Sequence, residues 1–374
     1  MKIGIFSDTH LGYLRFEEDS YSQALLALTE CEKQSDILIC AGDIFDTKTP
    51  KLETLKKAFE IFSKTQKKIV MIFGNHERRT KDSINPVQLL SSLPNLVLLH
   101  GKDYVFEKDN QKIQFFGLSS VPEEYAQTAL KKTLESFTPI PDAFKILIIH
   151  QSIAELMVQG EFSNELSLEY LSTLPFDLII NGHIHEKTIS LNGKFLIPGS
   201  TVVTQLKKEQ SEKRGYFIYD TLEKTATYNH IHSRPFHFIE LNFKDATLTD
   251  VESQINSSLS SISKDEKDPI ICIKLKGTLL EGNSPNNLNL PKSNFLFIDN
   301  SLDNESLLSK IEKIQQLRSD STSLKTLAIS QLIKRTDGKI TLFEPIEFFE
   351  KLSTENQTVE TLLASINKNP NPPK

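Results

Sequence analysis

The chain has 374 residues, a formal net charge of −6 at pH 7, 38% hydrophobic residues and 25% charged residues. This length allows a sizeable core and more than one domain, and the composition excludes a chain that is disordered throughout. The acidic balance also excludes a general polyanion-binding surface, so any contact with nucleic acid must come from local basic clusters or from bound metal.

Short apolar runs alternate with stretches of helical period over the first two thirds of the chain. This alternation predicts an α/β fold with a layered α/β/α domain. The predicted strands are residues 3–6, 37–40, 69–73, 145–149 and 178–180. An apolar face from Tyr21 to Leu28 predicts a helix with Ser20 and Gln23 as a capping box. A second amphipathic helix is predicted from Leu52, Leu55, Phe59 and Phe62.

The pattern changes near Ser233. A strand at 234–241, a helix at 251–262 and a strand at 269–275 predict a small α+β capping domain, followed by an Asn- and Pro-rich stretch at 281–292. Helical patterns return at 307–317 and from Glu344 onward, and the tail is expected to be disordered. The predicted domains are therefore 1–232, 233–300 and a helical C-terminal segment at 301–374.

Side chains that can bind metal follow each of the five predicted strands. They are Asp8 and His10, Asp43, Asn75 and His76, His150, and His183 and His185. A single residue of this kind is usually a cap, a turn residue or a satisfied polar group. Because ligands bind outside the carboxyl ends of strands in open α/β sheets, the joint placement predicts a metal site. The four histidines outside the pattern are expected to be structural: His100, His230, His232 and His237.

The motifs D-x-H, G-D-x-x-D, G-N-H-E, a lone H and G-H-x-H, in this order, resemble those of the calcineurin-like metallophosphoesterase superfamily. The resemblance covers about residues 1 to 230. Within it, the residues 42–46 (GDIFD), 234–236 (RPF) and 269–270 (PI) are similar to the double-strand-break repair nuclease family. That family includes bacterial SbcD and the archaeal and eukaryotic meiotic recombination nuclease.

The resemblance implies two manganese ions per chain, although other divalent metals also suit the ligand types. One ion would take Asp8, His10 and His185, the other Asn75, His150 and His183, with Asp43 bridging both. Two divalent ions and two carboxylates would leave about two positive charges uncompensated, which attracts a phosphodiester. His76 is the candidate general acid that protonates the leaving oxygen.

Two residues depart from the superfamily pattern or leave their roles open. Glu77 stands where an Asp is common, so its role in orienting His76 is undecided. Asp46 stands where archaeal and eukaryotic relatives often have His, and it is either part of the site or a cap of the helix that follows Pro50. The basic residues Arg78, Arg79 and Lys81 either hold the DNA backbone or form a solvated loop.

The family resemblance implies a manganese-dependent DNA nuclease, with 3′-5′ double-strand exonuclease and single-strand endonuclease activity, that processes DNA ends. The alternative is another calcineurin-like phosphodiesterase or phosphatase that acts on nucleotides or phosphoproteins. No G-x-x-x-x-G-K-[ST] motif occurs, so ATP chemistry would come from an SbcC-type coiled-coil ATPase. The resemblance also implies a homodimer.

Two short amphipathic helices at the C-terminal end would bind that ATPase. Their apolar positions are Ile346, Phe349 and Leu352 in the first, and Val359, Leu362, Leu363 and Ile366 in the second. The alternative is that the pair folds back on the phosphoesterase domain.

The remaining features concern the compartment. Cys31, Cys40 and Cys272 show no C-x-x-C spacing and are expected to be reduced, buried thiols. The start of the chain does not read as a signal peptide, and no apolar run approaches the roughly 18 residues of a membrane span. We expect no membrane association and a cytoplasmic, nucleoid-associated protein.

Overall fold

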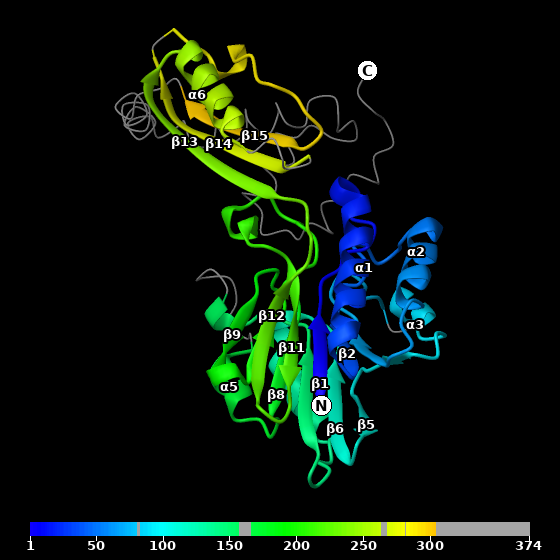
Figure 1. Ribbon diagram of the computed structural model, residues 1–374. Helices are drawn as coiled ribbons and strands as arrows, with labels where there is room; N and C mark the ends of the chain where they lie inside the picture. The colour runs from blue at the N-terminus through cyan, green and yellow to red at the C-terminus, as the bar shows by residue number, and fades with distance from the viewer. Residues whose placement is uncertain (81–82, 157–165, 263–267, 281, 304–374) are drawn as a thin grey trace, which may run out of the picture. The chain divides into compact units, whose positions relative to one another are not determined.

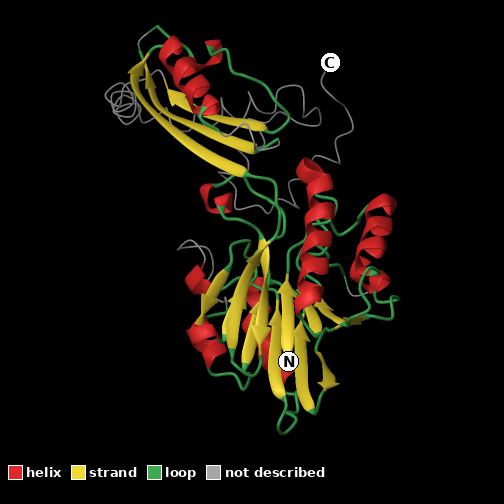
Figure 2. Cartoon of the chain, viewed as in Figure 1, coloured by secondary structure: helices red, strands yellow, loops and turns green. Residues whose placement is uncertain are grey.

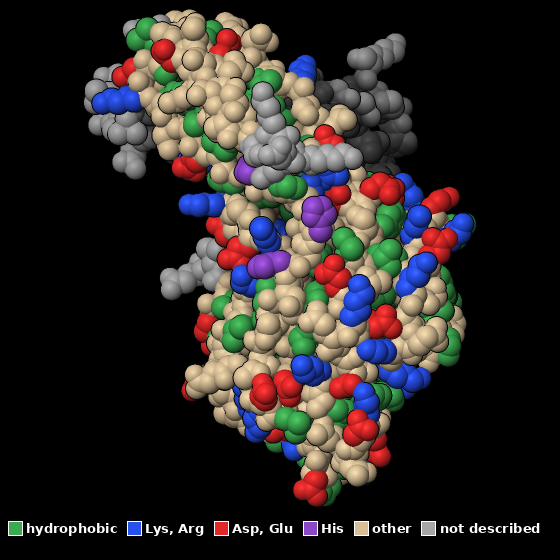
Figure 3. All heavy atoms as spheres, in the orientation of Figure 1, with side chains coloured by type: hydrophobic (Ala, Val, Ile, Leu, Met, Phe, Trp, Pro, Cys, Tyr) green, Lys and Arg blue, Asp and Glu red, His purple; other side chains and the backbone are tan. Residues whose placement is uncertain are grey.

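The computed structural model describes residues 1–80, 83–156, 166–262, 268–280 and 282–303. Figures 1 and 2 show the arrangement of its helices and strands. Among the described helices, none is long and apolar enough to cross a membrane. Basic and acidic side chains are interspersed over the face drawn in Figure 3, as the nearly balanced composition leads one to expect.

The first six-stranded sheet has the order β12-β11-β1-β2-β3-β4. Its strands are β1 (Lys2–Phe6), β2 (Ile37–Ala41), β3 (Ile69–Ile72), β4 (Leu96–Leu98), β11 (Gly215–Asp220) and β12 (Thr225–His230). The strands β1 to β4 are parallel to one another, whereas β11 pairs with β1 and with β12 in antiparallel fashion. Three of the predicted strands therefore lie side by side at the centre of this sheet.

The second six-stranded sheet has the order β5-β6-β7-β8-β10-β9. Its strands are β5 (Lys102–Lys108), β6 (Gln111–Leu118), β7 (Phe144–Ile149), β8 (Leu178–Asn181), β9 (Thr188–Ser190) and β10 (Phe195–Ile197). The strands β6, β7, β8 and β10 are parallel, and β5 and β9 are antiparallel edges. The other two predicted strands, β7 and β8, are neighbours in this sheet.

The two sheets pack face to face through one buried apolar cluster. Ile5 and Ile39 of the first sheet and Ile148 and Ile180 of the second belong to this cluster and are fully buried. The residues that alternate with them, such as Cys40, point to the opposite faces, because side chains alternate along a strand. Strands buried on both faces read as continuous apolar runs, which is why the sequence revealed them.

Helices cover the two outer faces. The first sheet is covered by α1 (Glu17–Gln34), α2 (Leu52–Phe62) and α3 (Pro86–Leu90), and the second by α4 (Ala126–Leu134) and α5 (Leu168–Ser172). The predicted layered α/β fold is confirmed. The sequence did not reveal that the β layer consists of two sheets.

Two local predictions for the helices were wrong. The helix α1 begins at Glu17, and the Ser20 hydroxyl donates to the Glu17 carbonyl oxygen (2.7 Å), so Ser20 is not its cap. Leu52 is 80% exposed although it was expected on the buried face of α2. The buried face is instead formed by Thr54, Ala58, Ile61 and Phe62.

Beyond the second antiparallel strand of the first sheet, the chain forms a third, three-stranded sheet of order β13-β14-β15. It comprises β13 (Phe236–Ala246), β14 (Ile270–Leu279) and β15 (Leu296–Asp303), and α6 (Leu248–Ser260) connects β13 to β14. The predicted strand, helix and strand are present with shifted bounds, and β15 was not predicted. The predicted C-terminal helices and tail lie outside the described residues.

Six short 3-10 helices lie in the connections of the described chain. They are η1 (Leu14–Phe16), η2 (Glu123–Tyr125), η3 (Ala154–Leu156), η4 (Leu191–Gly193), η5 (Lys208–Ser211) and η6 (Pro285–Asn287).

Candidate metal centre

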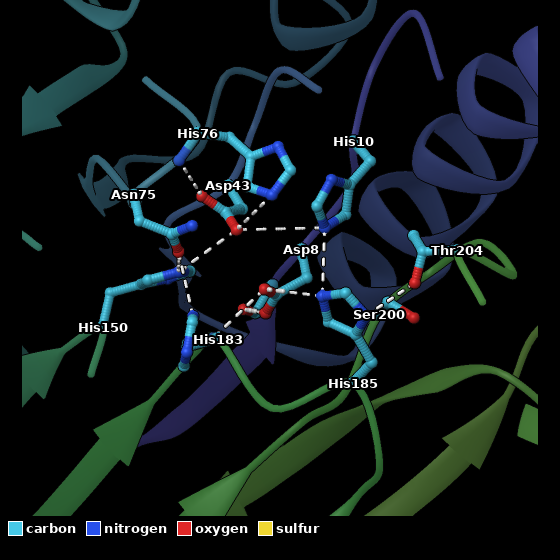
Figure 4. Close-up of polar contacts among 12 residues, drawn as sticks. Asp8, His10, Asp43, Asn75, His76, His150, His183, His185, Ser200 and Thr204 are labelled. Carbon is cyan, nitrogen blue, oxygen red and sulfur yellow. Dashed lines mark hydrogen bonds and ion pairs between the residues drawn. The ribbon is translucent and has the colours of Figure 1, made fainter. Parts of the chain in front are cut away.

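The seven predicted ligands lie together where five parallel strands end. Figure 4 shows Asp43 between His10 and His150, with Asp8 and the other two histidines beside them. The first sheet supplies its residues from the ends of β1, β2 and β3, and the second from the ends of β7 and β8. The convergence that the strand-end rule predicted is therefore present in the structure.

One group of ligand atoms comes from Asp8, His10, Asp43 and His185, and these atoms all lie within 4.8 Å of one another. The Nε2 atoms of His10 and His185 are 3.2 Å apart. His185 Nε2 is 3.7 Å from Asp8 Oδ1, and His10 Nε2 is 3.9 Å from Asp43 Oδ2. Two imidazole nitrogens and two carboxylates at this spacing can hold a divalent cation.

A second group shares Asp43 with the first. It contains Asp43, His150 and His183, again with ligand atoms within 4.8 Å of one another. Asn75 Oδ1 lies 3.2 Å from His150 Nε2 and 2.9 Å from His183 Nδ1. Asp43 Oδ2 is 3.3 Å from His150 Nε2. Asp43 is thus the residue common to both groups.

The outer nitrogens of two rings show which nitrogens face the centre. His150 Nδ1 lies 2.7 Å from the Ala41 carbonyl oxygen, which can only accept a hydrogen bond. His10 Nδ1 lies 3.3 Å from Asp46 Oδ1, which as a carboxylate also accepts. In their neutral forms both rings therefore present the lone pair of Nε2 to the centre, as metal-binding histidines do. The donor set fits a divalent metal.

Burial and the mutual charges shift the pKa values at the centre. Burial alone would raise the pKa of Asp43, but His150 and His10 hold it well below its usual range. Burial raises the pKa of Asp8 to about 6. Burial would lower the pKa of His150, but the Asp43 carboxylate raises it to about 9. Protons and metal cations therefore compete for the His150 nitrogen.

Four of these residues adopt left-handed backbone conformations, with φ of 51° at Asp8, 42° at His10, 47° at Asp43 and 76° at His183. Such angles are uncommon outside glycine and persist where the surrounding structure enforces them. The neighbouring Gly74 is required for a different reason. A Cβ atom there would lie 1.9 Å from Asp43 Oδ1. The loops are thus built around the positions of the carboxylates.

His76 stands at the open side of the centre, and its side chain is 36% exposed. Its Nδ1 is 2.6 Å from the Asp46 carbonyl oxygen. The possibility that Glu77 orients His76 is not what the structure shows. Glu77 is fully buried, and its carboxylate accepts from the N–H groups of Phe45 (2.6 Å) and Gly74 (2.7 Å). Burial and the nearby Asp43 raise the pKa of Glu77 to about 8.

Asp46 was left open between a site residue and a helix cap. The cap position of α2 is Lys51, and no side chain caps that helix. Asp46 instead contacts His10 through its side chain and His76 through its carbonyl group. The cap alternative is therefore wrong, and Asp46 belongs to the surroundings of the centre.

Three polar residues that the sequence did not single out contact the predicted histidine ligands. Thr204 Oγ1 lies 2.6 Å from His185 Nδ1, and Arg214, which is 4% exposed, donates to the His185 carbonyl oxygen (3.2 Å). Ser152 Oγ lies 3.1 Å from His183 Nε2. Only Ser152 carried a signal, since it follows His150 by two residues.

The basic residues beside His76 line a cavity of about 960 Å³ that also includes Lys48 and Asn75. Arg78 and Arg79 both line it, and Arg79 Nη1 also donates to the Ile84 carbonyl oxygen (3.0 Å). Lys81 lies outside the described residues.

Comparison with known proteins identifies relatives. The sequence profile of the calcineurin-like phosphoesterase family matches residues 1–187, half of the 374 residues. The DNA double-strand break repair protein Mre11 of Methanocaldococcus jannaschii is 24% identical over 290 residues, which are 72% of this chain and 75% of that protein. Its namesake from Methanococcus maripaludis is 28% identical over 239 residues, 57% of this chain and 61% of the relative. The SbcD component of the nuclease SbcCD from Staphylococcus epidermidis is 24% identical over 252 residues, with 59% and 66% covered.

Proposed function

Because this chain belongs to the calcineurin-like phosphoesterase family, we propose that it is a metal-dependent nuclease that processes DNA ends in double-strand break repair. The observation that carries the proposal is the pair of ligand groups that share Asp43, with His76 beside them. The named repair proteins among its relatives support DNA as the substrate.

The proposed centre holds two divalent cations. One would be bound by Asp8, His10 and His185, and Asp43 would contribute to both positions. The other would be bound by the remaining residues, Asn75, His150 and His183. Nitrogen and oxygen donors without thiolate suit manganese, iron or zinc, and we propose manganese on the family resemblance. Two carboxylates compensate only two of the four charges, and the remainder favours a phosphodiester.

The proposed chemistry divides between the cations and His76. When bound, the cations activate a water and stabilise charge on the phosphoryl group. Since His76 Nδ1 donates to the Asp46 carbonyl oxygen, a second proton resides on Nε2 and can be given to the leaving oxygen. The partial exposure of His76 lets a substrate reach it.

DNA binding is proposed for the cavity beside His76, where Lys48, Arg78 and Arg79 are close enough together to hold a phosphate backbone. Elsewhere on the face shown in Figure 3, charges of both signs are mixed, which does not suit a long polyanion. We propose 3′-5′ exonuclease activity on duplex ends and endonuclease activity on single strands.

The proposed partner is an SbcC-type coiled-coil ATPase, bound through the C-terminal residues, and the proposed assembly is a homodimer located at the nucleoid. One relative is itself named as part of the SbcCD nuclease. Truncation after Asp337 should leave a folded nuclease that no longer co-purifies with the ATPase. Unchanged co-purification, or loss of folding, would contradict this assignment.

Nuclease activity is tested by incubating the full chain with end-labelled duplex DNA, single-stranded DNA and a chromogenic phosphodiester. Each substrate is supplied with manganese, magnesium or a chelator. DNA cleavage with manganese and none with chelator is expected, and Asp43→Asn should lose both cleavage and manganese binding. Hydrolysis of the chromogenic compound without DNA cleavage would favour a small-molecule phosphodiesterase instead.

A further inference from the structure

A chain of three polar side chains lies on the outer side of the His183 ring. The Oγ atom of Ser152 is 3.1 Å from His183 Nε2 and 2.6 Å from Glu123 Oε1. On the inner side of the same ring, Nδ1 is 2.9 Å from Asn75 Oδ1. Ser152 is 2% exposed, and Glu123 is partly exposed in η2. All four residues line one cavity of about 290 Å³.

Counting protons fixes the direction of these hydrogen bonds. A serine hydroxyl has one proton, and an ionised carboxylate only accepts. The Ser152 proton is therefore donated to Glu123, and the Ser152 oxygen accepts from His183 Nε2–H. The neutral His183 ring then carries its proton on Nε2 and a lone pair on Nδ1.

That lone pair belongs to a set with no proton to share. His150 donates through Nδ1 to the Ala41 carbonyl oxygen, so its neutral ring has a lone pair on Nε2. This Nε2 and His183 Nδ1 lie 3.2 Å and 2.9 Å from the same Asn75 oxygen, which also only accepts. Three lone pairs that converge in this way suit a cation and repel one another without one.

We infer that Ser152 and Glu123 are positioning residues that hold His183 in the tautomer that binds metal through Nδ1. This inference rests on the proposed metal centre. The carboxylate is essential because it takes the only Ser152 proton. Without it, that proton can be donated to His183 Nε2, which moves the ring proton to Nδ1 and into the position of the metal.

The inference predicts the effect of four variants on manganese binding. Ser152→Ala and Glu123→Ala should each weaken one of the two binding steps by about 10–100-fold, the range seen when outer partners of metal ligands are removed. The double variant should be no worse than Ser152→Ala, because both residues act through one hydrogen bond to the ring. Ser152→Thr keeps the hydroxyl and should bind as the original chain does.

Manganese titration followed by electron paramagnetic resonance measures the number of ions and the affinity of each, without any need for catalysis. The neighbouring exposed residue supplies the control, since Glu124→Ala removes the same charge and should change neither step. Equal manganese binding by Ser152→Ala and the original chain would overturn the inference. Melting curves in chelator verify that each variant is folded.

Nitrogen-15 spectra of the histidines in the metal-free protein read the tautomer directly. His183 should carry its proton on Nε2 in the original chain and lose that preference in Glu123→Ala. A proton on Nδ1 in the original chain would refute the inference even if the protein cleaves DNA. Failure to cleave DNA, with two ions bound and the Nε2 tautomer present, would refute the nuclease proposal alone.

Discussion

The Nδ1 atom of His76 lies 2.6 Å from the backbone carbonyl oxygen of Asp46. Because a carbonyl oxygen only accepts, Nδ1 is the donor and Nε2 points to the centre, 3.9 Å from Asp43 Oδ2. The group that orients the ring is part of the main chain. Side-chain substitution at position 46 therefore leaves the orientation in place, which separates the roles of the two residues experimentally.

Replacing His76 should remove catalysis but not metal. We expect His76→Ala to lower the rate of DNA cleavage by about 10²–10⁴-fold, the usual contribution of a positioned acid. Manganese stoichiometry, measured by calorimetry, should stay the same because His76 belongs to neither of the two groups that share Asp43. Loss of an ion in this variant would make His76 a ligand rather than an acid.

Replacing the Asp46 side chain should have the opposite effect. In Asp46→Ala the carbonyl contact to His76 remains, but His10 Nδ1 loses its carboxylate partner. Manganese should bind about 10-fold more weakly at one position. With saturating manganese, the pH profile of cleavage should match that of the original chain. A shifted profile would show that the Asp46 side chain acts on the acid.

Glu77 should contribute to stability rather than to chemistry. In Glu77→Ala the buried N–H groups of Phe45 and Gly74 lose their acceptor, which costs about 1–3 kcal/mol for each. Denaturant unfolding in chelator should show this loss in the free energy of unfolding. The matched control is Glu60→Ala on the surface of α2, where about 0.5 kcal/mol or less is expected. Equal stability of the two variants would contradict the assignment.

Neutralising Arg78 and Arg79 should weaken DNA binding regardless of sequence and flatten its dependence on salt. Each phosphate contact that is lost lowers the slope of log K against log salt by about 0.9 for duplex DNA. The double variant Lys56→Ala/Lys57→Ala removes the same charge from exposed positions on α2 and should leave the slope unchanged. Identical slopes for the two double variants would show that Arg78 and Arg79 are merely solvated.

The sequence was sufficient to predict the centre because its ligands directly follow strands that are buried on both faces. The apolar runs that precede Asp8, Asp43 and His183 belong to β1, β2 and β8. Each run ends where its strand ends, so the position of the side chain follows from the position of the run. No knowledge of the loops was needed.

The second sheet and the outer contacts were not predictable in the same way. The edge strands β5 and β12 are half exposed and contain as many polar as apolar residues, so they lack an apolar run. The bond from Arg214 to the His185 carbonyl oxygen joins residues that are 29 positions apart. Such contacts depend on the three-dimensional path of the chain, about which a local pattern carries no information.

The left-handed conformations of Asp8, His10, Asp43 and His183 have a consequence for motion. Each costs about 1–2 kcal/mol, so the ligand loops have more to gain from opening than the strands that carry them. Two amides bridge the loops, since Asp8 N–H donates to the Gly42 carbonyl oxygen and His10 N–H to that of Asp43. Their hydrogen exchange should therefore be faster than that of the strand amides, and metal should slow it most at these two positions. The ligand loops would then behave as a gate that the cation itself closes, on a frame that stays rigid.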